Sequence, residues 1–382
     1  MQSQSKNICN NLTDIIYICI NLKMHSPIFK RNIFYLRNNR CMQYLLSFTF
    51  MLMAATVCFS QSGESAYIDR LAVGTSIYVI TNRVVDSSQI NPYFLNRVKS
   101  DPSLTFLQVI YHGNDSLEIV PMDSTRFISG IRGKYDDWLL FVHGDSKTFR
   151  QAVMRGFDIQ ELHNVNVIVF SWPSKDPEIS GIKNFKNSRQ NVIRSNGHFT
   201  SVICIMRSFR QLNPAFQSGA RLSMFIHSLG NYYLENLVIQ TKSLCGPPAV
   251  FDNLVLNAAA VNQEHHNEWV GQLRFQDRIY IISNVSDFNL KGVRIFTKDG
   301  KQLGEKIKPP LTETAIYVNF TKAVGFRFPT GTTHTYFIGK VPDTSINIRL
   351  FYHDIIHGLE PDLKDARMFK ARSDGLGHDI IF

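Results

Sequence analysis

The chain has 382 residues, of which 44% are hydrophobic and 19% are charged, a composition typical of a globular protein with a sizeable core. Its formal net charge is +10, but half of that excess lies in residues 1–60, where six basic residues accompany a single acid, Asp14. The remaining charge forms no dense lysine and arginine run interleaved with aromatic residues, which argues against nucleic-acid binding.

Residues 30–61 have the pattern of a secretory signal peptide. Four basic residues, the last of them Arg40, precede the apolar stretch 44–59, and small polar residues follow from Ser60. The apolar stretch is too short for a comfortable membrane span. We therefore expect cleavage near Ser60 and export to the periplasm or the extracellular space, with membrane association left open. Lipidation of Cys58 is the less favoured alternative, because Val57 is larger than the residue expected before a lipidated cysteine.

The cysteines and histidines show no metal-binding pattern. Four of the six cysteines lie in residues 1–61, and only Cys204 and Cys245 remain. These two form either one disulfide or separate thiols, since Cys204 falls in an apolar helical run that would also suit a buried thiol. The chain has no C-x-x-C pair and no H-E-x-x-H motif, so neither a metal nor another cofactor is expected.

Strands and helices alternate along the chain after this point. The expected strands cover residues 76–83, 104–111, 117–120, 138–145, 165–172, 222–226, 251–259, 278–284 and, as the last, 315–320, and the expected helices cover 149–162, 185–212, 232–239 and 263–273. Parallel strands need crossover connections, which are usually right-handed helices. The alternation therefore predicts an α/β protein with a mostly parallel central sheet and helices on both faces.

The stretch 221–239 carries the clearest chemical signal. Ser228 stands between a buried strand and a helix, with Gly230 two residues later, where a side chain would clash. A sharp turn of this kind exposes the serine hydroxyl, and the helix that follows directs its N–H groups toward a developing oxyanion. Ile226 replaces the first glycine of the usual G-x-S-x-G pattern, so taken alone the stretch also fits a serine that caps a helix.

The order of motifs resembles the α/β-hydrolase fold. His143-Gly144 follows the third main strand, Ser171-Trp172-Pro173-Ser174 the fourth, the serine turn the fifth and Asp287 the seventh. Over roughly residues 75–340 the chain is similar to a bacterial α/β-hydrolase family known mainly as a domain of unknown function. Its members carry an H-G turn, a W-P-S turn, an H-S-M-G-N elbow, a D-x-A-L segment and a G-H-S-Y-F segment.

This resemblance implies a catalytic triad of Ser228 as nucleophile, Asp287 as acid and His334 as base. The chain order Ser, Asp, His agrees independently with the nucleophile-elbow hydrolases. Two residues depart from the family pattern, because Asn289 replaces a small apolar residue and Thr333 replaces the glycine before the histidine. The other candidate bases are His353, His357 and His378, but His334 is favoured because a loop rich in Gly, Pro and Thr joins it to the strand 315–320.

The turns after the strands supply the other candidate site residues. The backbone N–H groups of Leu229 and Asp145 are the candidate oxyanion donors. Val261 stands where the family's A-P-D turn carries an acid, and His227 is expected to be a packing residue. The predicted pocket is lined by His143, Gly144 and Trp172, although His143 also fits a residue that only shapes its turn and Trp172-Pro173 also fits a simple strand stop.

The sequence therefore predicts an exported serine hydrolase that cleaves an ester, thioester or amide through an acyl-enzyme. The expected substrate is a small or lipid-like acyl compound, and the alternative is a binding or scaffold protein with no turnover on the same fold. We divide the chain into an N-terminal extension with signal peptide (1–61), a hydrolase domain (62–345) and a C-terminal extension (346–382). The sequence specifies neither the substrate nor the oligomeric state.

Overall fold

The computed structural model describes residues 68–86, 88, 93–179, 181–240, 248–297, 299–325 and 327–382. The predicted signal peptide, Cys58 and Cys245 lie outside these residues. Cys204 is exposed on its helix, so of the two alternatives open for it, a disulfide or a buried thiol, the structure contradicts the burial. Within the described part of the chain, no helix has the length and apolar character needed to cross a membrane.

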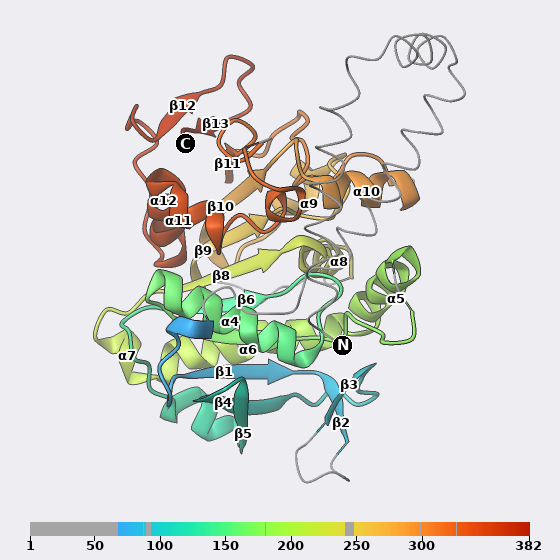
Figure 1. Cartoon of the computed structure of the whole chain (residues 1–382), viewed down its shortest axis with the longest axis vertical. Helices are drawn as coiled ribbons and strands as arrows, with labels where there is room; N and C mark the ends of the chain where they lie inside the picture. The colour runs from blue at the N-terminus through green and yellow to red at the C-terminus, as the bar shows by residue number, and fades with distance from the viewer. Residues whose placement is uncertain are drawn as a thin grey trace, which may run out of the picture. The chain divides into compact units, whose positions relative to one another are not determined.

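The centre of the molecule is an eleven-stranded sheet in the order β12-β13-β11-β10-β9-β8-β6-β7-β1-β4-β5 (Figure 1). Neighbouring strands from β13 through β1 in this order run parallel, while β12 and β4 run antiparallel to their neighbours. The predicted mostly parallel sheet is therefore confirmed. The strands are β1 (Ser76–Thr81), β4 (Thr105–Gly113), β5 (Ser116–Met122), β6 (Trp138–Val142), β7 (Asn166–Ser171), β8 (Leu222–His227), β9 (Phe251–Asn257), β10 (Gln276–Ser283), β11 (Ala315–Asn319), β12 (Phe369–Ala371) and β13 (His378–Ile380).

Helices cover both faces of this sheet, as two adjacent residues of β7 show. Val169 packs so close to Gly156 of α4 that a β-carbon added to Gly156 would lie 2.5 Å from a methyl group of Val169. Phe170 packs on the opposite side, against Phe199 of α6 and Tyr233 of α8. Successive strand side chains point to opposite faces, so α4 lies on one face and α6 and α8 on the other. The helices are α4 (Phe149–His163), α5 (Gly181–Arg194), α6 (Asn196–Leu212), α7 (Pro214–Gln217), α8 (Tyr232–Gln240), α9 (His266–Val270), α10 (Phe288–Thr297), α11 (Lys340–Thr344) and α12 (Ile346–Ile356).

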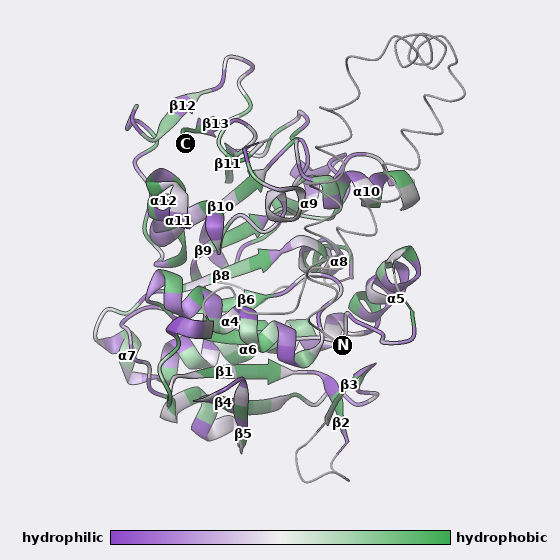
Figure 2. Ribbon diagram, in the orientation of Figure 1, coloured by the Kyte–Doolittle hydropathy of each residue, from purple (hydrophilic) through white to green (hydrophobic). Residues whose placement is uncertain are grey.

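The core follows the strands with the most continuous apolar sequence. Every residue of β6, β7 and β8 is buried, and Figure 2 shows the central strands as largely hydrophobic. Such strands have no polar face because helices cover the sheet on both sides.

The helix predicted over residues 185–212 is in fact two helices, α5 and α6. Ser195 separates them with backbone angles of φ −108° and ψ 17°. Its hydroxyl donates to the Asn191 carbonyl at 2.5 Å and bonds to the Tyr233 hydroxyl at 2.7 Å. A serine side chain that bonds to the preceding turn competes with regular helix geometry and so favours a break at this position. The spacing of the apolar residues continues across the break, so the sequence pattern predicted one helix.

The C-terminal residues extend the sheet, contrary to the expectation that residues 315–320 form its last strand. β13 pairs in parallel with β11, and β12 pairs with β13. These two strands have only three residues each, which is too short for a recognisable alternation of apolar and polar side chains. The sequence also missed a separate hairpin of β2 (Arg83–Asp86) and β3 (Tyr93–Val98), and α9 is shorter than the predicted helix 263–273.

Candidate active site

Ser228 occupies a sharp turn at the carboxyl end of β8. Its φ is +53°, a left-handed backbone conformation that costs a non-glycine residue about 1–3 kcal/mol and that is enriched at functional sites. The close packing around the turn explains two glycines. A β-carbon on Gly230 would lie 2.8 Å from the His143 carbonyl oxygen, and one on Gly144 would lie 2.7 Å from the β-carbon of Ser228. The turn therefore requires glycine at both positions.

Asp287 and His334 form a buried pair. The Nδ1 of His334 donates to Oδ2 of Asp287 at 2.6 Å, and Oδ1 of the same carboxylate accepts the backbone N–H of Leu290 at 3.1 Å. Asp287 follows β10 and directly precedes α10, while His334 follows β11 and a short turn. The side chain of Asn284 donates to the Thr333 carbonyl at 2.8 Å, and so joins the segment after β10 to the histidine loop.

Ser228 and His334 line the same cavity of about 90 Å³. Because Nδ1 of His334 donates to Asp287, Nε2 is the unprotonated nitrogen of the neutral ring. No hydrogen bond to Nε2 is formed by any residue that the structure describes, and none joins it to the Ser228 hydroxyl. The structure thus brings the predicted nucleophile and base together at one cavity without a direct bond, as is common in sites without substrate.

His227, next to Ser228, supports the loop that carries His334. Its Nε2 donates to the backbone carbonyl of His334 at 3.1 Å, and the two ring centroids lie 4.7 Å apart. Burial, followed by the nearby His334, holds the pKa of His227 well below its ordinary value. His227 is therefore neutral and acts as a packing residue that positions the histidine loop.

His143 and Trp172 form a second rigid unit beneath the cavity. His143 donates through Nδ1 to the Gly144 carbonyl at 2.8 Å and accepts the backbone N–H of Trp172 at Nε2. The indole N–H of Trp172 donates back to the His143 carbonyl, and the two rings stack with an angle of 4° between them. Burial lowers the pKa of His143 to about 3. Trp172 itself is fully buried behind His143 and does not line the cavity, which corrects the prediction for this residue.

The loop from β6 to α4 forms one wall of the cavity. Asp145, Ser146 and Lys147 lie on it, together with Arg155 from α4. The carboxylate of Asp145 accepts hydrogen bonds from the Asn184 amide at 2.9 Å and the Ser146 hydroxyl at 3.1 Å, and burial raises its pKa. The sequence pattern pointed to Asp145 only for its backbone N–H. Neither cation nor Asn184 could be predicted, because single polar or charged residues on a turn or helix carry no periodic signal.

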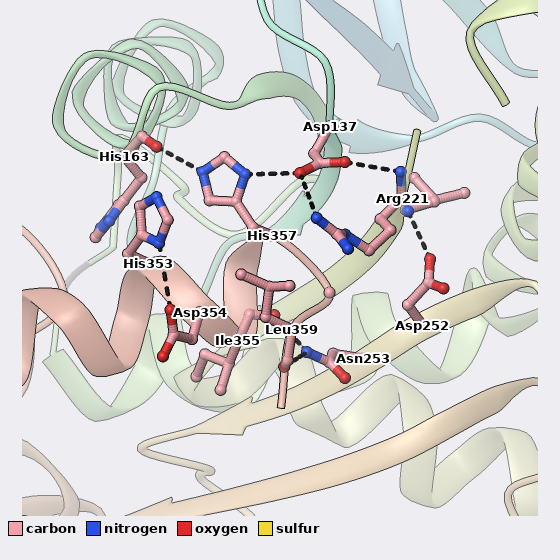
Figure 3. Close-up of polar contacts among 12 residues, drawn as sticks. Asp137, His163, Arg221, Asp252, Asn253, His353, Asp354, Ile355, His357 and Leu359 are labelled. Atoms are coloured by element: carbon pink, nitrogen blue, oxygen red, sulfur yellow. Dashed lines mark hydrogen bonds and ion pairs between the residues drawn. The ribbon is translucent and has the colours of Figure 1, made fainter. Parts of the chain in front are cut away.

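The other candidate histidines lie away from this cavity. His378 is in β13, paired in register with Val318 of β11. His353 and His357 belong to a polar cluster around Asp137, the residue directly before β6 (Figure 3). Ser228 and Asp287 follow their strands, whereas Asp137 precedes its strand. The two sites therefore lie at opposite ends of the parallel strands, the first at the carboxyl ends and the second at the amino ends.

These features define the α/β-hydrolase fold, with a serine after β8, an acid after β10 and a histidine after β11. A family model described as alpha/beta hydrolase of unknown function (DUF900) matches residues 124–316, and the chain belongs to this family. The matched range contains Ser228 and Asp287 and ends before His334. No curated protein matches the chain.

Proposed function

We propose that this protein is a serine hydrolase that cleaves an ester, thioester or amide through an acyl-enzyme on Ser228. The observation that carries the proposal is the open Nε2 of His334, oriented by Asp287, at the cavity that also contains the strained serine. In open α/β sheets, ligands bind at the carboxyl ends of the strands, which is where this cavity lies.

In this mechanism His334 takes the proton of the Ser228 hydroxyl as the serine attacks the acyl carbonyl, and later returns it to the leaving group. Asp287 keeps the imidazole in the required tautomer and stabilises the imidazolium. The backbone N–H groups of Leu229 and Asp145 would donate to the oxyanion, each lowering the barrier by about 3 kcal/mol. Water then attacks the acyl-enzyme by the same route, with His334 as base.

The first test is covalent labelling with a fluorophosphonate. Wild-type protein should be labelled at Ser228, and Ser228→Ala should lose the label. Ser146→Gly is the matched control, because Ser146 lines the same cavity and its φ of +60° accommodates glycine. Labelling that persists in Ser228→Ala, or folded wild-type protein that takes up no label, would overturn the proposal.

The rival function is a binding protein without turnover on the same fold. The observation in its favour is that no hydrogen bond joins Ser228 to His334. Hydrolysis of 4-nitrophenyl esters of increasing acyl length distinguishes the two functions. We expect turnover that is fastest for short acyl groups, because a cavity of about 90 Å³ has room for only a few water-sized groups. No release of nitrophenolate from any ester would favour the binding protein.

We also propose that the protein is exported, on the basis of the basic and apolar pattern in residues 30–60. The mature N-terminus should then lie near Gln61. Mass spectrometry of the protein from its host would show this terminus, whereas an uncleaved cytoplasmic protein would contradict the proposal.

A further inference from the structure

Two cations line the cavity beside the serine, and neither forms an ion pair with an acid of the described chain. Lys147 lies on the loop after β6, and Arg155 lies on α4. Among the residues that the structure describes, neither side chain forms an ion pair or a hydrogen bond through its charged group. The one acid on the same wall is Asp145, whose two carboxylate oxygens already accept bonds from Asn184 and Ser146.

The contrast with Arg83 shows how this protein treats an arginine that serves structure. Arg83 is fully buried, and its guanidinium donates to the Ser171 hydroxyl at 3.1 Å, to the Asn96 side chain at 2.6 Å and to the carbonyls of Lys147 and Trp172. Every branch of that guanidinium is satisfied by protein atoms, and it anchors the backbone of Lys147. Arg155 has no such set of acceptors, so a purely structural role leaves its donors unexplained.

The two unpaired cations also disfavour one another. Burial, followed by the nearby Arg155, lowers the pKa of Lys147 to about 7, while Asp145 opposes this shift. Burial lowers the pKa of Arg155 as well, with Asp158 acting against it. Cations in partly buried sites are normally neutralised by an anion that accepts charge-assisted hydrogen bonds. Asp145 and Asp158 act electrostatically on Lys147 and Arg155 respectively, but neither cation forms an ion pair within the part of the chain that the structure describes.

We propose that the substrate carries an anionic group, a carboxylate or a phosphate, which binds between Lys147 and Arg155 while its acyl carbon lies at Ser228. This assignment rests on the serine hydrolase function proposed above and narrows its substrate class. The two cations stand on the loop and helix that follow β6, and Ser228 follows the adjacent strand β8. A compact substrate with its charge a few bonds from the scissile carbonyl fits this arrangement and the small cavity.

The test compares esters that differ in one charged group. On the acyl side, the mono-4-nitrophenyl ester of fumarate carries a carboxylate where 4-nitrophenyl crotonate has a methyl group. On the leaving-group side, 4-acetoxyphenyl phosphate is compared with 4-acetoxyanisole. For each pair the quantity measured is the ratio of kcat/KM for the charged ester to that for the neutral ester. Intrinsic reactivity cancels when this ratio is compared between wild type and variants.

We expect Lys147→Gln and Arg155→Gln each to lower the ratio for one of the pairs by about tenfold or more, as the loss of a charge-assisted hydrogen bond does. Arg150→Gln is the matched control, because Arg150 lies on the same helix but is exposed and paired with Asp115. Its ratio should equal that of wild type. A response in the fumarate pair identifies a carboxylate on the acyl group, and a response in the phosphate pair identifies a phosphate on the leaving group. Unchanged ratios for both pairs in both variants would overturn the proposal.

A binding measurement separates this inference from the hydrolase function and does not depend on whether Arg155→Gln folds. Calorimetry on Ser228→Ala should detect fumarate or inorganic phosphate, and the added substitution Lys147→Gln should weaken that binding about tenfold or more. If fluorophosphonate labelling succeeds but neither anion binds, the anionic subsite is wrong and the hydrolase function stands. If the anion binds but no label is taken up, the site is a ligand-binding site, and its role toward a substrate is overturned.

Discussion

The protein contains two buried Asp–His pairs at opposite ends of the strands of one sheet. The pairs differ in what the second ring nitrogen of the histidine contacts. In His334–Asp287 the Nδ1 to Oδ2 distance is 2.6 Å, and Nε2 has no hydrogen-bond partner in the described chain. In His357–Asp137 the equivalent distance is 2.9 Å, but Nε2 donates to the His163 carbonyl at 2.7 Å (Figure 3). The first histidine retains an atom that can accept a substrate proton, whereas both nitrogens of the second are occupied by the protein.

The second pair therefore has the geometry of a structural clamp. His357 directly follows α12, His163 ends α4 and Asp137 precedes β6, so one imidazole links three elements that are distant in sequence. Asp137 also accepts the backbone N–H of Arg221 at 2.8 Å, which adds the start of β8. Burial disfavours the charged form of His357, but its bonds to Asp137 and to the His163 carbonyl raise its pKa overall. Under the proposed function, the same residue types would serve chemistry in one pair and stability in the other, according to which ring nitrogens are left without a protein partner.

The largest expected effect follows from breaking the first pair. We predict that His334→Ala and Asp287→Asn each lower kcat/KM by about three orders of magnitude or more, because the serine then lacks a correctly oriented base. Both variants should keep a native far-ultraviolet circular dichroism spectrum. Steady-state hydrolysis of a short 4-nitrophenyl ester measures the loss, and near-wild-type activity in His334→Ala would exclude this residue as the base.

Breaking the second pair should have the opposite profile. His357→Ala leaves the Asp137 carboxylate without its imidazole partner, so we predict that the free energy of unfolding falls by about 2 kcal/mol. The value of kcat/KM should stay within about tenfold of wild type, a change of about 1.4 kcal/mol or less in the barrier. Urea unfolding and ester hydrolysis measure the two quantities. A loss of activity comparable with that of His334→Ala, in a variant of native stability, would contradict the clamp.

The contribution of the clamp should also depend on pH in a defined direction. The pKa of His357 is raised in the folded protein, so its protonated form favours folding. That stabilisation is fully present below the unfolded value of about 6.5 and is lost as the pH rises through the raised pKa. We therefore predict that the difference in unfolding free energy between wild type and His357→Ala is largest near about pH 6 and shrinks toward alkaline pH. A difference that grows with pH would show that the neutral ring makes the clamp.

The buried neutral histidines should show the reverse dependence. Burial lowers the pKa of His143 and of His163 to about 3. The unfolded chain binds protons at these residues below about pH 6.5 and the folded protein does not, so folding stability decreases as the pH falls from there. We predict that urea unfolding of His357→Ala shows this acid destabilisation without the opposing contribution of the clamp. A flat stability profile between about pH 6.5 and pH 4 would contradict it.

The smallest effect is expected at His353, which stacks on His357 with ring centroids 4.3 Å apart but is itself exposed. Its Nδ1 lies 3.4 Å from Asp354, a weak surface contact. His353→Ala should change the free energy of unfolding by no more than about 0.5 kcal/mol, and kcat/KM by less than about tenfold. Measured beside His357→Ala, this variant shows whether stability depends on the bonded imidazole or on the stacked rings as a whole.

Local pattern within the sequence was sufficient for the α/β architecture and for the turn that contains Ser228, whereas Asp287 and His334 were assigned through the resemblance to a known family. The apolar strands and the glycines around Ser228 are properties of short segments. Such features depend on backbone geometry and side-chain periodicity, which neighbouring residues largely determine. They predicted the parallel sheet, the helices on both faces and the sharp turn that contains the serine.

The distinction between the two histidine pairs arises only from tertiary structure. Nothing around His357 in the chain shows that Asp137, 220 positions earlier, will meet it, or that the His163 carbonyl will occupy its second nitrogen. The same holds for Trp172, which the fold buries behind His143, and for Lys147 and Arg155, which it turns toward one cavity. The groups that accept a side chain's hydrogen bonds or neutralise its charge meet it only after the sheet has assembled. The chemistry of each side chain therefore depends on contacts that no local sequence pattern records.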